Sequence, residues 1–137
     1  MERVSVEVPA ELVGRVRETV LLLYEVTAES LHLALRAHSE GRSSPRELHE
    51  SRTRLAQLDG LLTQLGGPPG SRRLSAPAEL LHDAFYGALI DAGERLAVTA
   101  SSSWRGEQPL ERVQEAAAEV LALHRLLRRL EALSSSG

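Results

Sequence analysis

Val4-Ser-Val-Glu-Val8, followed by Pro9, alternates β-branched apolar residues with polar ones and then stops. A period of two is typical of a short strand with one buried face, because successive side chains of a strand point to opposite sides. The three valines are therefore predicted to face inward. The side chains predicted to face outward are Arg3, Ser5 and Glu7.

No other stretch of the sequence has a strand pattern, and no internal repeat is evident. An isolated strand leaves its backbone donors and acceptors unpaired, which costs free energy wherever they are buried. We therefore expect the strand to pair with the same strand of a second copy, within a homodimer or higher oligomer.

Helical periodicity replaces the alternation after Pro9. Apolar residues recur every three or four positions in four segments, and loops rich in Gly, Pro and Ser, such as Ser101-Ser-Ser-Trp-Arg-Gly106, separate them. The clearest helix start is Ser44-Pro-Arg-Glu47, with a capping serine and a proline at the first helical position. The predicted helices are about 10–40, 45–65, 77–99 and 109–133, with a disordered tail at 134–137. The sequence thus predicts one all-α domain over 1–137, an antiparallel four-helix bundle with a short N-terminal strand or arm.

Composition excludes several kinds of chemistry. The 137 residues are 42% hydrophobic and 26% charged, which suits one compact domain. The absence of cysteine excludes disulfides, thiolate catalysis and cysteine-ligated zinc. All 16 basic residues are arginine, which excludes lysine Schiff bases and indicates a GC-rich bacterial gene. No apolar stretch is long enough to span a membrane and no targeting segment is evident, so we expect a cytoplasmic protein.

Catalytic motifs are missing from the sequence. The serines cluster in loops and none lies in a Gly-x-Ser-x-Gly turn, so we predict neither enzymatic activity nor a cofactor. Glu29-Ser-Leu-His32 and Glu79-Leu-Leu-His82 have the Glu-x-x-His spacing of di-iron helical bundles. On a helical wheel Glu29, His32 and Glu79 fall on polar faces, so no metal site is predicted, and a metal-binding bundle is kept only as a third alternative.

Two histidines raise the question of a buried polar layer. If the helices alternate up and down in one bundle, His124 of the fourth helix is level with the region of Tyr24 and His82. A polar layer of these three side chains is therefore a hypothesis for the bundle interior, set against ordinary core packing.

Residues 3–36 resemble a ribbon-helix-helix DNA-binding domain. The match rests on the strand register, on Pro9-Ala-Glu-Leu12 at the start of a first helix, and on Thr27-Ala-Glu-Ser-Leu31 at the start of a second. The resemblance implies that two protomers pair one strand each and place the ribbon in the DNA major groove. It also implies that Arg3, Ser5 and Glu7 contact DNA. The sequence leaves open whether residues 20–28 form a turn or a continuous helix.

The last predicted helix has two apolar faces. One face has Leu110, Val113, Ala117, Val120, His124 and Leu127, and the other has Leu123, Leu126, Leu130 and Leu133. A helix needs one such face for its own core, so the second indicates a partner. We therefore predict a non-enzymatic oligomeric interaction or regulatory module whose partner is itself or another protein's helix. The alternative is a ribbon-helix-helix transcriptional regulator or antitoxin.

Overall fold

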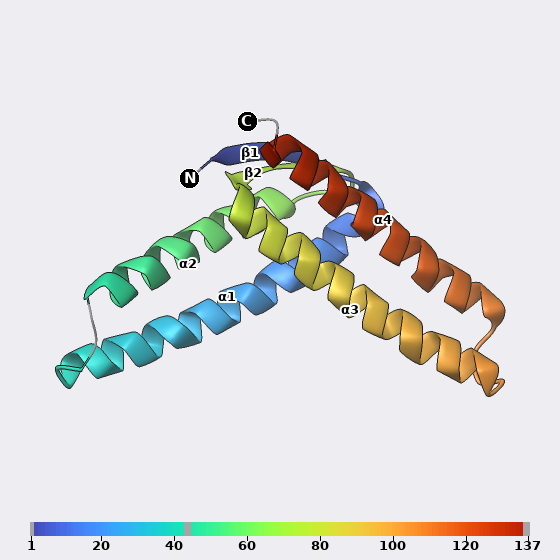
Figure 1. The fold of residues 1–137 in the computed structure, drawn as a ribbon, viewed down its shortest axis with the longest axis horizontal. Coiled ribbons are helices and arrows are strands. Elements are labelled where there is room, and N and C mark those ends of the chain that lie inside the picture. The colour runs from blue at the N-terminus through green and yellow to red at the C-terminus, as the bar shows by residue number, and fades with distance from the viewer. Residues whose placement is uncertain (1, 43–44, 136–137) are drawn as a thin grey trace.

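The computed structural model describes residues 2–42 and 45–135, and within them the chain forms four helices and two strands (Figure 1). In chain order these are β1 (Arg3–Val8), α1 (Ala10–Ser39), α2 (Pro45–Leu65), β2 (Arg72–Pro77), α3 (Ala78–Trp104) and α4 (Leu110–Ser135). The predicted all-α fold with four helices is confirmed. The helices pack pairwise, α1 with α2 and α3 with α4, and these two arms diverge from an apex where the strands lie (Figure 1).

Strand β1 has its partner within the same chain, so the expectation that a second copy must pair with it is wrong. β2 pairs antiparallel with β1. The inward-facing valines are confirmed, since Val6 and Val8 are buried and Val4 is half-buried. The sequence of β2, Arg72-Arg-Leu-Ser-Ala-Pro77, contains no β-branched residue. Its strand form depends on pairing with β1 and on the burial of Leu74 and Ala76, which local propensity does not report.

The chain contains an internal repeat, which corrects the expectation that it has none. Each half consists of a strand, a long helix and a second helix. Val8-Pro-Ala-Glu-Leu12 and Ala76-Pro-Ala-Glu-Leu80 occupy the same strand-to-helix junction and differ at one residue. Elsewhere only the apolar pattern is shared, so the repeat is hard to recognise in the sequence.

The two halves are related by a pseudo-two-fold axis. Pro77 lies 68 positions after Pro9, and the same offset makes Leu74 the equivalent of Val6. Val6 and Leu74 are also directly opposite in the sheet. Because equivalent residues face each other only at a two-fold axis, the axis passes between this pair.

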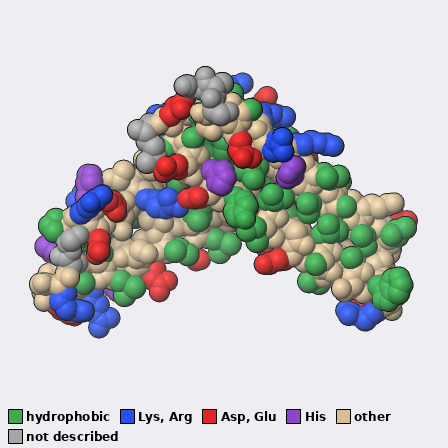
Figure 2. Space-filling model, viewed as in Figure 1, with side chains coloured by type: hydrophobic (Ala, Val, Ile, Leu, Met, Phe, Trp, Pro, Cys, Tyr) green, Lys and Arg blue, Asp and Glu red, His purple; other side chains and the backbone are tan. Residues whose placement is uncertain are grey.

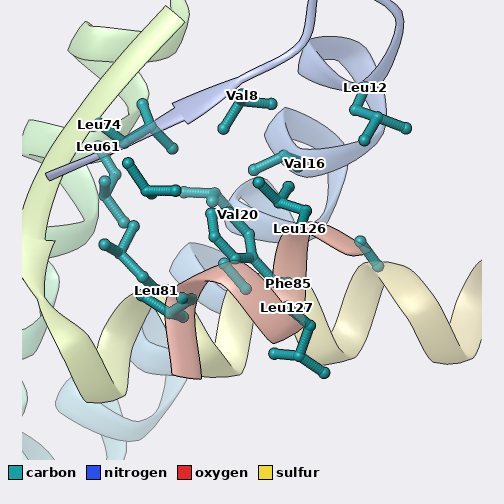
Figure 3. Packing of buried hydrophobic residues seen from close by; sticks show 14 of the residues in the cluster. Val8, Leu12, Val16, Val20, Leu61, Leu74, Leu81, Phe85, Leu126 and Leu127 are labelled. Carbon is teal, nitrogen blue, oxygen red and sulfur yellow. The ribbon is translucent and has the colours of Figure 1, made fainter. Parts of the chain in front are cut away.

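The hydrophobic core lies at the apex and receives side chains from all six elements (Figure 3). The first long helix contributes Leu12, Val16 and Val20, and Phe85 of α3 is fully buried. The second helix of each half uses the same spacing of leucines, which are Leu58, Leu61 and Leu65 in α2 and Leu123, Leu126 and Leu130 in α4. Since each fully buried large apolar side chain contributes about 1.5–3 kcal/mol, the apex supplies most of the stabilisation of the fold.

Several predicted boundaries shift. The helix predicted to end at residue 99 continues through the serines to Trp104 and ends before Gly106, whose φ of 79° favours glycine. Residues 134–135 belong to α4 and not to a disordered tail. Residues 136–137 and the predicted capping Ser44 lie outside the described residues. Residues 20–28 are helical, so α1 is continuous where the ribbon-helix-helix resemblance implies two helices.

Candidate functional site

The outward face of the β1–β2 sheet has the polar side chains predicted for it. Arg3, Ser5 and Glu7 are exposed, and each forms a hydrogen bond with a residue of β2 or with Ser71, which precedes β2. Arg3 Nη2 donates to the Ser75 carbonyl oxygen (3.1 Å), Arg73 Nη1 donates to Ser5 Oγ (3.3 Å), and Ser71 Oγ donates to Glu7 Oε1 (3.2 Å). These bonds fasten the two halves of the chain together at the apex.

The hypothesis of a buried polar layer of Tyr24, His82 and His124 is wrong. His82 and His124 are exposed, and Tyr24 is half-buried over α2, where it lines a shallow pocket with Leu55. The layer requires all four helices to share one bundle, whereas the arms diverge and separate residues of equal height. His82 instead stacks on Tyr86, with ring centroids 5.8 Å apart.

The two Glu-x-x-His pairs point to solvent, as the helical wheel predicts. Glu29, His32, Glu79 and His82 are all exposed. Within residues 2–42 and 45–135, no three histidine or acidic side chains gather in a way that could hold a metal ion.

A cavity of about 280 Å³ lies along α3 and α4, and charged side chains line it. Glu119 of α4 forms an ion pair with Arg15 Nε of α1 (2.8 Å) and accepts a hydrogen bond from Arg95 Nη2 of α3 (2.6 Å). One carboxylate thus joins three helices, and it neutralises two of the arginines that line the cavity. This network joins the arms near the apex, and sequence periodicity gave no signal for it because its members lie far apart in the chain.

Apolar side chains are exposed mainly on the arms. Hydrophobic atoms cover much of the α3–α4 arm on the right of Figure 2, while charged groups are more frequent on the α1–α2 arm. Of the two apolar faces predicted for α4, the face containing Leu123, Leu126 and Leu130 is core. The other face is covered incompletely, and Leu110 at its start is exposed.

The exposed apolar residues of α3 form one stripe. Tyr86, Ile90, Ala97 and Trp104, here called the α3 stripe, are separated by four, seven and seven residues. Such spacing places side chains on one side of a helix and is typical of a seam for a partner helix. All four are exposed, and Trp104 at the end of the arm is 92% exposed.

Helix α1 has a shorter stripe of the same kind. Leu22, Val26 and Leu33, here called the α1 stripe, are separated by four and seven residues, and all are exposed. Leu22 and Ile90 are equivalent positions in the internal repeat. Both long helices therefore have an apolar seam that nothing in the described chain covers.

Comparisons with known proteins identify no relative of the chain. No family model, no curated protein and no solved structure matches it. In the part of the chain that the structure describes, no helix combines the length and apolar character needed to cross a membrane.

Proposed function

We propose that the chain is a non-enzymatic interaction module that self-associates through the α3 and α1 stripes. The α3 stripe supports this proposal most directly. It places Trp104, the one tryptophan of the chain, almost wholly in water, together with three further apolar side chains on the same side of one helix. A stripe of this length is a common mark of a protein interface.

A second copy of the chain suits these stripes. Helix-to-helix seams need apolar residues at matching intervals on both partners. The α1 stripe repeats the four- and seven-residue intervals with which the α3 stripe begins, so one copy presents seams that another copy can match. The proposal does not depend on strand pairing between copies, because β1 and β2 pair with each other.

Light scattering across a range of protein concentrations tests the proposal. The parent chain is expected to have the mass of a dimer or higher oligomer at micromolar concentration. Replacing Ile90 and Trp104 by Gln should lower that mass to the monomer, because polar side chains on the seam lose the gain from apolar burial.

Leu21→Gln with Leu35→Gln is the matched control. Both leucines are exposed on α1 but lie outside the two stripes, so their replacement should leave the mass unchanged. A parent chain that is monomeric at every concentration, or a stripe variant that keeps the parent mass, would contradict the proposal.

DNA binding by the sheet is the second candidate. The observation in its favour is that the outward face of the β1–β2 sheet presents Arg3, Ser5, Glu7 and Arg73, all exposed, on a two-stranded antiparallel ribbon. Antiparallel ribbons of this kind enter the major groove in several DNA-binding proteins. Here one chain supplies both strands. The negative charge of Glu7 and the net charge of −3 oppose phosphate attraction, which is why this function ranks second.

Gel shifts at low and moderate salt test this second candidate. If the ribbon contacts DNA, Arg3→Ala should weaken retardation and flatten its salt dependence, since one contact and its released counterions are lost. Glu7→Arg should strengthen retardation. No retardation of pooled genomic DNA by the parent chain at low salt would rule this candidate out.

A further inference from the structure

The two long helices cross where one half has a threonine and the other a glycine. Thr19 of α1 and Gly87 of α3 are equivalent positions, since they lie 68 residues apart. They also touch, because a Cβ atom added to Gly87 would lie 2.9 Å from Thr19 Cγ2. Equivalent residues that meet at a two-fold axis would be identical in a symmetric dimer. Here a side chain on one half occupies the space that a missing side chain leaves on the other.

Two ion pairs that join the halves also lie at equivalent positions of the repeat. Where one half has an arginine, the other half has an acidic residue. Arg15 of α1 binds Glu119 of α4 (2.8 Å), and Asp83 of α3 binds Arg54 of α2 (3.0 Å). The 68-residue offset relates Arg15 to Asp83. The second helices of the two halves are related by an offset of 65 residues, as their buried leucines show: Leu58, Leu61 and Leu65 of α2 correspond to Leu123, Leu126 and Leu130 of α4. The same offset relates Arg54 to Glu119. Each pair therefore joins the first helix of one half to the second helix of the other.

We propose that these two features restrict the interface at the apex to unlike halves. If two first halves paired through the same interface, Thr19 would meet Thr19 and Arg15 would meet Arg54. If two second halves paired, Asp83 would meet Glu119 and the glycines would leave a gap. The partner that this surface accepts is thus the complementary half, in the same chain or in a second copy, and like halves are rejected by overlap and by like charge.

A cysteine placed on the pseudo-two-fold axis reports on like-half pairing in the full chain. Val6 faces Leu74 in the observed sheet, but in a pair of first halves Val6 would face its own counterpart. Directly opposite residues of antiparallel strands have Cα atoms about 4.5–5.5 Å apart, a spacing that a disulfide can bridge. Since the chain has no cysteine, a Val6→Cys chain can form an intermolecular disulfide only through that residue.

The decisive variant adds Thr19→Ala, Arg54→Glu and Asp83→Arg to Val6→Cys. The ion pair between positions 54 and 83 is reversed but kept, so the observed pairing of unlike halves retains its attraction. In pairs of like halves, however, Arg15 now meets a carboxylate at position 54, Glu119 meets a guanidinium at position 83, and the threonine overlap is gone. After refolding in a glutathione buffer, the covalent dimer should be several-fold more abundant than with Val6→Cys alone, and it should increase with protein concentration.

The matched control reverses an ion pair within α2 and leaves the pair at the apex unchanged. Arg46 and Glu50 form an ion pair within α2, so Arg46→Glu with Glu50→Arg, in the Val6→Cys and Thr19→Ala background, reverses as many charges. This control should stay at the level of Thr19→Ala with Val6→Cys. Equal covalent dimer in the control and the decisive variant, or no increase in the decisive variant over Val6→Cys alone, would overturn the proposal. Oligomers formed through the stripes do not affect the readout, because Val6 is buried at the apex.

Discussion

The apex and the arms of this molecule use similar residues in opposite ways. At the apex, apolar side chains from six elements bury one another, and Phe85 is completely covered. Along the arms, each pair of helices covers only the seam between its own members, and Val98 of α3 is 67% exposed. The comparison indicates that stability is concentrated at the apex, while the arms have apolar surface available for a partner.

Phe85 and Val98 provide the largest test of this contrast, since both lie on α3, one at the apex and one on the arm. Phe85→Ala should lower the free energy of unfolding by about 3–5 kcal/mol, because it leaves a cavity among fully buried residues. Val98→Ala should change it by less than about 0.5 kcal/mol, because the Val98 side chain is 67% exposed and lies outside both stripes. Urea denaturation measures both. Similar losses for the two variants would remove the distinction between apex and arm.

Two glycines of α3 should respond to alanine with opposite signs. Gly87→Ala should destabilise the chain by about 1–3 kcal/mol, because the new methyl group overlaps Thr19 Cγ2 at the apex. Thr19 is β-branched, and its hydroxyl donates to the Arg15 carbonyl oxygen (3.2 Å), so rotation does not easily relieve the overlap. Thr19→Ala in the same chain should restore most of the loss.

Gly93→Ala is the corresponding change where α3 enters the arm. Apart from its chain neighbours and the adjacent backbone of α3, no described atom lies within 4 Å of the added Cβ, so the substitution should stabilise the chain by up to about 1 kcal/mol through better helix propensity. Thermal unfolding of both variants gives the comparison directly. Destabilisation at Gly93 as large as at Gly87 would show that helix α3 is packed as tightly along the arm as at the apex.

The ion network that joins the arms should have the smallest effect. Glu119 is 23% exposed and binds arginines of two other helices, so Glu119→Gln should cost about 1 kcal/mol. Glu50 is 62% exposed and forms an ion pair with Arg46 within α2, so Glu50→Gln should cost a few tenths of a kcal/mol. Chemical denaturation at low salt compares the two. Equal values would indicate that Glu119 does not join the arms energetically.

Local pattern was enough to predict the elements that follow a strict period. The alternation of Val4–Val8 gave the facing of β1, and the spacing of leucines gave the four helices. Strand β2 could not be predicted in this way, because nothing in Arg72–Pro77 favours a strand until β1 lies beside it.

The candidate site was predictable only as a surplus of apolar positions. The two apolar faces of α4 indicated surface for a partner, but most of α4's apolar side chains are buried or half-buried, and the exposed stripes lie on α3 and α1. The sequence did not show that the arms diverge. Divergence exposes the α3 stripe and also separates Tyr24, His82 and His124. Contacts between equivalent positions, such as Thr19 with Gly87, require knowledge of where the two-fold axis lies.

The fluorescence of Trp104 as a function of protein concentration tests the central proposal most directly. Trp104 is the one tryptophan of the chain, lies at the end of the α3 stripe and is 92% exposed. If the stripes are the seam between copies, the emission should move to shorter wavelength over the same concentrations at which light scattering shows the mass increase. An emission that stays at the wavelength of a water-exposed indole while the mass increases would contradict the proposal.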